Sequence, residues 1–185
     1  MNKITSVCVY CASSTKIASA YFEAARELGT LLGQRHIRLI NGAGGIGLMR
    51  ATADAVLAAG GEVTGVIPHF MVEQGWQHKG LTEMIEVENM HQRKQKMADL
   101  SDAVIALLEI ITWKQLGLYL NPVVILNTNN FFDPLLAMLQ HAMDENFMRE
   151  QHGAIWHVAS TPQEAVELIH TIPVWDSSIR KFAAI

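Results

Sequence analysis

The chain has 185 residues, of which 50% are hydrophobic and 17% are charged. This length suits one globular domain, and the composition excludes a disordered chain. Fourteen Lys and Arg against 18 Asp and Glu give a net charge of −4, which argues against a nucleic-acid partner. With no run of about 18 apolar residues, no signal peptide and only two Cys, we expect a cytoplasmic protein without membrane contact.

Short apolar runs alternate with segments of helical length. The expected strands are 4–10, 37–41, 62–67, 84–87, 103–107, 123–126 and 155–159. The expected helices are 17–34, 46–59, 89–99, 109–118, 134–146 and 162–172. The strands are nearly continuous runs of Val, Ile and Leu, which is typical of strands buried on both faces. We therefore predict a single α/β domain over 1–185, a doubly wound, Rossmann-like parallel sheet with helices on both faces.

A glycine-rich loop, NGAGGIGLM at 41–49, joins the second strand to the second helix. Ligands of such folds bind at these junctions, where glycines expose backbone N–H groups and a helix N-terminus attracts anions. We predict a phosphate site here; the alternative is a tight turn that needs glycine for steric reasons alone. The loop also matches G-x-G-x-x-G, but the next strand ends without the acidic residue that binds ribose, and Glu62 lies at its other end.

Two further segments carry candidate polar contacts. Ser13 and Ser14 follow the first strand and predict either a phosphate or ribose contact or an ordinary helix cap. Arg93 and Lys94 lie on or beside the apolar stripe of the helix at 89–99, which predicts a phosphate or purine partner. The alternative is that both side chains extend to solvent.

We expect no chemistry from two residue types that often carry it, Cys and His. Cys8 and Cys11 form a C-x-x-C spacing within a strand, where we expect packing rather than redox chemistry. Three histidines have no metal-ligand spacing, so we expect no metal site; they are His69, His78 and His91.

The junction between Leu107 and Leu108 is unusual. A strand runs directly into a helix there, without Gly, Pro, Asn or Ser to turn the chain. Such connections normally take about two to six residues. Either an element is shorter than expected, or a segment is absent at a strand's carboxyl end.

Five motifs in this order carry a resemblance that covers nearly the whole chain. They are CASS at 11–14, the glycine loop at 41–49, MHQRK at 90–94, ITWKQLG at 111–117 and FFDPLL at 131–136. The sequence resembles the Lonely Guy family of cytokinin riboside 5′-monophosphate phosphoribohydrolases, many of which were once labelled lysine decarboxylases. A decarboxylase is excluded because no pyridoxal phosphate site with its Schiff-base Lys is present.

The sequence departs from the family pattern at two places. Ala12 stands where the family usually has Gly. The family signature P-G-G-x-G-T-x-x-E is missing between Leu107 and Leu108, and Glu109 falls one helical turn after the signature's Glu. We infer that the printed sequence omits a segment of the whole protein; the alternative is a deletion.

The resemblance implies a homodimer that needs no cofactor and hydrolyses the N-glycosidic bond of N6-modified adenosine 5′-monophosphates or AMP. The products would be the free base and ribose 5-phosphate, formed through an oxocarbenium-like state. By resemblance, Arg93 is catalytic, and the missing Glu is the second catalytic group. The implied substrate and phosphate contacts are Lys94, Thr112, Gly44, Gly45, Gly47, Ser13, Ser14 and Glu73. The competing hypothesis is a nucleotide-binding module without catalysis.

Overall fold

The computed structural model describes residues 3–106, 120–145 and 150–174. Its strands are β1 (Ser6–Tyr10), β2 (Arg38–Asn41), β3 (Val63–Pro68), β4 (Glu83–Val87), β5 (Ala103–Ala106), β6 (Val123–Leu126) and β7 (His157–Ala159). Its helices are α1 (Ser19–Gln34), α2 (Gly47–Ala58), α3 (His69–Glu73), α4 (Met90–Asp99), α6 (Asp133–Asp144) and α7 (Pro162–Thr171). Two short 3-10 helices are η1 (Thr128–Asn130) and η2 (Glu150–Ile155). No helix in these ranges is both long and apolar enough to span a bilayer.

The seven strands form one sheet in the order β4-β3-β2-β1-β5-β6-β7, and every strand pair is parallel. The chain builds outward from β1 to β4 and then returns to place β5 on the other side of β1. The strand that follows β1 therefore lies on its β4 side, whereas the strand that follows β5 lies on its β7 side, so the strand order reverses between β1 and β5. In folds of this type, ligands bind at the carboxyl edge near such a reversal.

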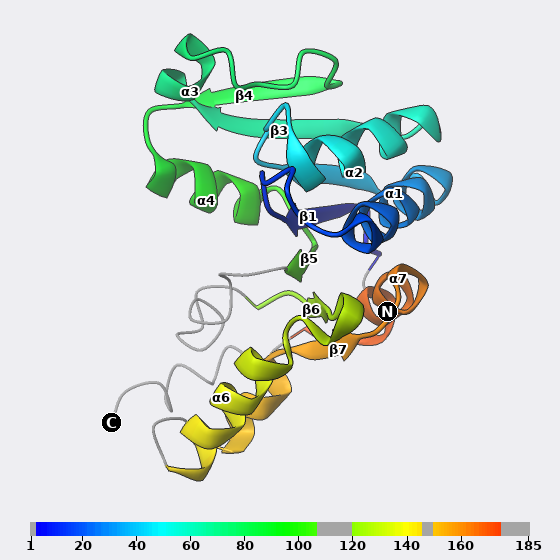
Figure 1. The fold of residues 1–185 in the computed structure, drawn as a ribbon, viewed down its shortest axis with the longest axis vertical. Coiled ribbons are helices and arrows are strands. Elements are labelled where there is room, and N and C mark those ends of the chain that lie inside the picture. Colours follow the sequence, from blue (N-terminus) through cyan, green and yellow to red (C-terminus); the bar gives the residue numbers. More distant parts are fainter. Residues whose placement is uncertain (1–2, 107–119, 146–149, 175–185) are drawn as a thin grey trace.

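Helices cover both faces of the sheet (Figure 1). On one face, α1, α2 and α7 bury the largest apolar cluster, which includes Leu28, Val56 and Ile169. On the other face, Met97 and Ala98 of α4 pack on the central strands. This confirms the predicted doubly wound α/β fold.

The structure differs from the sequence expectations at two strands. β4 lies at the edge of the sheet and is largely exposed rather than buried on both faces, because it has one neighbouring strand and little helical cover. The expected strand at 155–159 starts later, since Ile155 ends η2. The short helix α3 was not expected, and the helix expected at 109–118 lies outside the described residues.

Candidate active site

Arg93 lies at the carboxyl edge of the sheet, one turn into α4. The helix begins at Met90 after Asn89, whose side-chain oxygen accepts a hydrogen bond from the N–H of Gln92 at 2.9 Å. From there the Arg93 guanidinium reaches back over β3, where Nε donates to the carbonyl oxygen of Val66 at 3.0 Å. Its Nη2 donates to the carbonyl oxygen of Gly42. Two backbone carbonyls therefore orient the guanidinium plane at the ends of β2 and β3.

Two methionine sulfurs also lie near the Arg93 guanidinium. Its Nη1 lies 3.6 Å from the sulfur of Met90 and 3.9 Å from that of Met71. A hollow of about 120 Å³ opens beside the guanidinium, and Lys94 and Gly42 also line it. The structure thus brings the two predicted cations and the start of the glycine loop to one place.

The glycine loop lies against the segment that follows β1. Gly47 starts α2 with a φ of +66°, and a Cβ at this position would overlap the backbone carbonyl of Ser13. The N–H of Leu48 donates to the carbonyl oxygen of Ala12 at 3.0 Å. Both the left-handed conformation and the close approach require glycine. The predicted serine and glycine segments are therefore neighbours.

Not every amide of the loop points to an open site. The N–H of Gly45 donates to the carbonyl oxygen of Trp76 at 2.8 Å, and that of Ala43 donates to the side chain of Asn41 at 2.9 Å. Within the described residues, the amides of Gly47 and Met49 have no acceptor. Anion binding at this turn would therefore rely on the first turn of α2.

The other predicted contacts are less enclosed. Ser13 and Ser14 are exposed, and the Ser14 hydroxyl accepts a hydrogen bond from the N–H of Lys16 at 3.2 Å, as in an ordinary turn. Glu73 is exposed at the end of α3. Thr112 and the junction at Leu107 lie outside the described residues.

An apolar hollow of about 370 Å³ adjoins the Arg93 hollow, and Tyr10 and Cys11 line both. Phe131 forms its rim, with its ring edge-on to Tyr21 at 5.8 Å between centroids. This hollow was not predicted from the sequence, although the aromatic pair at 131–132 was a possible signal. Burial raises the pKa of the Cys11 thiol to about 12, although a hydrogen bond with Thr52 opposes the change. Cys11 is therefore a neutral thiol rather than a nucleophile.

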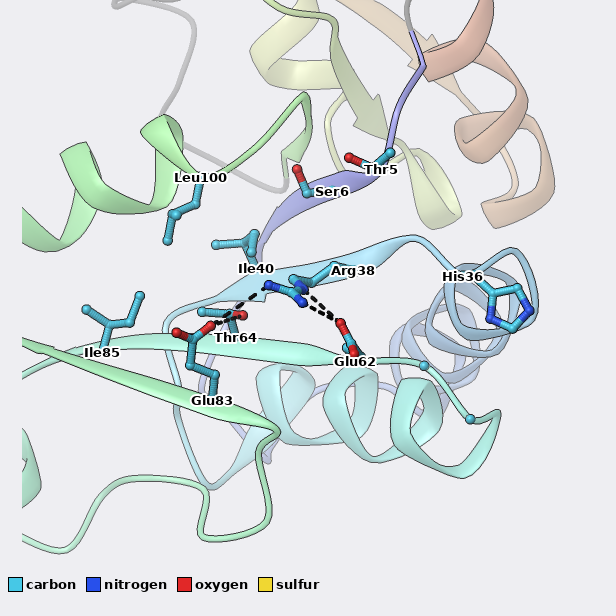
Figure 2. A pocket seen from close by; sticks show the side chains of 12 residues that line it. Thr5, Ser6, His36, Arg38, Ile40, Glu62, Thr64, Glu83, Ile85 and Leu100 are labelled. Carbon is cyan, nitrogen blue, oxygen red and sulfur yellow. Dashed lines mark hydrogen bonds and ion pairs between the residues drawn. The ribbon is translucent and has the colours of Figure 1, made fainter.

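A larger hollow, of about 690 Å³, lies at the amino ends of the strands (Figure 2). Arg38 spans it: Nε donates to Glu62 at 3.0 Å, and Nη1 lies 4.0 Å from Glu83. Glu83 also accepts a hydrogen bond from Thr64 at 3.0 Å. Arg38, Glu62 and Glu83 are therefore paired with one another, and they lie at the opposite edge of the sheet from Arg93. This confirms that Glu62 is at the wrong end of its strand to bind a ribose.

Comparison with known proteins gives consistent matches. A family model described as "Possible lysine decarboxylase" matches residues 49–169. A probable cytokinin riboside 5′-monophosphate phosphoribohydrolase, LOGL2, from Oryza sativa subsp. japonica is 40% identical over 171 residues, 87% of this chain and 70% of that protein. The cytokinin riboside 5′-monophosphate phosphoribohydrolase LOG from the same species is 38% identical over 190 residues, 94% of this chain and 78% of that protein.

A solved structure, the molybdenum cofactor carrier protein from Chlamydomonas reinhardtii, superposes with a TM-score of 0.68. It is 18% identical and covers 92% of this chain and 98% of its own, so it supports the fold alone.

The alignment with LOGL2 is longer than the part of this chain that it covers. The alignment with LOGL2 runs over 171 positions but uses 87% of the 185 residues, or about 161. About 10 aligned positions (171 less 161) therefore have no residue in this chain.

Proposed function

This chain belongs to the Lonely Guy family of cytokinin riboside 5′-monophosphate phosphoribohydrolases, and we propose that it hydrolyses the N-glycosidic bond of adenosine 5′-monophosphates. The substrates are AMP and its N6-modified derivatives, and the products are the free base and ribose 5-phosphate. The observation that carries the proposal is the guanidinium of Arg93. It is oriented by the carbonyls of Val66 and Gly42 beside a glycine loop, at the edge where ligands of this fold bind.

Two regions beside Arg93 suit the two ends of the substrate, one the 5′-phosphate and the other the base. The first turn of α2 and the serines after β1 are suited to the 5′-phosphate. Lys94 adds a cation beside the same hollow. The adjoining apolar hollow, with Phe131 at its rim, is suited to a purine ring or an N6 substituent.

The chemistry requires stabilisation of two charges. As the bond breaks, positive charge develops on the sugar and negative charge on the departing base. Arg93 is a fixed cation that can stabilise the base. A carboxylate must stabilise the sugar and direct water to it. We assign that carboxylate to the signature segment missing between Leu107 and Leu108, so the full activity depends on that segment being present.

A direct assay tests this proposal. Purified protein is incubated with AMP, and free adenine is measured by chromatography, with adenosine as the control substrate that lacks the phosphate. We expect adenine from AMP, little from adenosine, and none with the Arg93→Ala variant. Equal release from both substrates, or an unchanged rate in the variant, would contradict the assigned site.

The second candidate is a nucleotide-binding module without catalysis. It is favoured by one observation, the absence of the signature carboxylate from the sequence. Losing a carboxylate that acts as a general acid or base costs about 10²–10⁴ in rate, whereas the binding groups would remain. Calorimetric binding of AMP without adenine release would support the second candidate. Release of adenine would exclude it.

We also propose that the protein acts as a cytoplasmic homodimer, as the family resemblance implies. Light scattering coupled to size-exclusion chromatography is expected to give twice the monomer mass. A mass equal to the monomer would contradict the dimer.

A further inference from the structure

The loop between α3 and β4 lies against the glycine loop. Gln77 pairs with Gly44 in an isolated antiparallel bridge. Its two neighbours complete that bridge. The N–H of His78 donates to the carbonyl oxygen of Ala43 at 2.8 Å, and the carbonyl of Trp76 accepts from Gly45 at 2.8 Å. The backbone at 76–78 therefore supports the outer side of the glycine loop.

The side chain of His78 connects the same loop to α2. Its Nε2 lies 2.7 Å from Oδ1 of Asp54, and its side chain is 11% exposed. The N–H of Gly80 donates to Nδ1 at 3.0 Å, so Nδ1 accepts and Nε2 carries the hydrogen that is donated to Asp54. Asp54 also pairs with Arg50, one helical turn earlier.

These contacts close a ring. The glycine loop continues directly into α2, α2 presents Asp54 to His78, and the backbone of His78 returns to Ala43 within the glycine loop. The other side of the glycine loop is bonded to Arg93 through Gly42. A shift of the loop would therefore move both the first turn of α2 and the carbonyl that orients Arg93.

We propose that His78 is a positioning residue, which holds the glycine loop and the first turn of α2 in the geometry that binds the 5′-phosphate. This inference rests on the proposed function. His78 acts through Asp54 and the loop backbone and does not touch the substrate. Its loss should therefore weaken binding of phosphorylated ligands more than it slows the chemical step.

The chain offers a matched control. His69 makes a histidine–carboxylate pair of the same length, 2.7 Å from Nδ1 to Glu86, at the start of α3. It is more exposed, and among the residues that the structure describes no hydrogen bond links it to the glycine loop. Substituting His69 removes a comparable histidine–carboxylate hydrogen bond without disturbing the ring.

The experiment compares steady-state kinetics on AMP for the wild type, His78→Ala, His78→Gln and His69→Ala. We expect KM to rise about tenfold in His78→Ala, with a smaller change in kcat. The Gln variant keeps an N–H donor for Asp54 and should recover most of the affinity. His69→Ala should match the wild type. An unchanged KM in His78→Ala, or the same rise in His69→Ala, would overturn the inference.

Two further measurements distinguish a failure of the proposed activity from a failure of the positioning role of His78. If the wild type releases no adenine, binding of ribose 5-phosphate is measured by calorimetry, with the same tenfold weakening expected in His78→Ala. Hydrogen–deuterium exchange of the peptide at 42–49 needs no ligand and should be faster in His78→Ala than in His69→Ala. Equal exchange in the two variants, or no binding by the wild type, would overturn the positioning role.

Discussion

Arg93 and Gly42 are 51 residues apart in the chain, and the guanidinium of Arg93 donates a hydrogen bond to the carbonyl oxygen of Gly42. A Cβ at position 42 would overlap Nη2 of that guanidinium. Gly42 is therefore required by the presence of Arg93, not by its own backbone conformation.

Substituting Gly42 should displace the guanidinium. We expect Gly42→Ala to lower kcat/KM for AMP about 100-fold, because a small misplacement of a catalytic group is sufficient for that loss. Gly60→Ala is the control: Gly60 has a φ of +78° and open space around it, so alanine there should cost about 1 kcal/mol of stability and leave kcat/KM unchanged. An active Gly42→Ala enzyme would show that Arg93 does not need this position.

The shape of the Arg93 side chain should matter as much as its charge. Arg93→Lys keeps the charge but cannot donate to both Val66 and Gly42 in one plane, so we expect kcat/KM to fall about 100-fold with little change in Tm. The matched variant, Arg38→Lys, alters an ion pair at the opposite edge of the sheet and should keep its activity. Comparable activity in both variants would argue that only a positive charge is needed.

Asp102 should make folding stability depend on pH. Burial raises its pKa, but hydrogen bonds to one carboxylate oxygen from the backbone and side chains of Thr5 and Ser6 lower it by more. With the pKa lower in the folded state, the stabilisation is present above the unfolded pKa and is lost as pH falls through the folded value.

The Asp102→Asn variant measures this contribution. We expect it to lower the free energy of unfolding at pH 7 by about 1 kcal/mol, a value discounted for partial exposure. The difference from wild type should shrink at acidic pH, below about 4. Urea unfolding across pH checks this, with Asp99→Asn as an exposed control. A difference that persists at the lowest pH would contradict the assignment to the carboxylate.

Mass spectrometry should show whether a segment lies between Leu107 and Leu108. If the protein contains the missing signature, its intact mass will exceed 20.5 kDa, and a peptide map will show a glycine-rich segment with Glu between these residues. That result is expected together with adenine release from AMP. A mass of 20.5 kDa, with Leu107 bonded to Leu108, would instead predict a folded nucleotide binder without activity.

Local pattern in the sequence determined most of the fold. Apolar runs such as Val123–Leu126 are buried on both faces in a parallel sheet, so both the elements and the doubly wound class could be predicted. The pattern misled at Glu83–Val87, since a half-apolar strand is compatible with an edge or a central position. Strand order decides between these, and strand order depends on contacts between distant segments.

The same division holds for the site. The sequence by itself determined the candidate segments, because glycine spacing and a cation beside an apolar helical stripe are local features. Only the tertiary structure decided which of them touch. The order β3-β2-β1 sets the ends of β2 and β3 beneath α4, so that Arg93 meets Gly42 and Val66. His78 reaches Asp54, 24 residues away, for the same reason: a side chain's partner depends on the packing of whole elements, which no local spacing encodes.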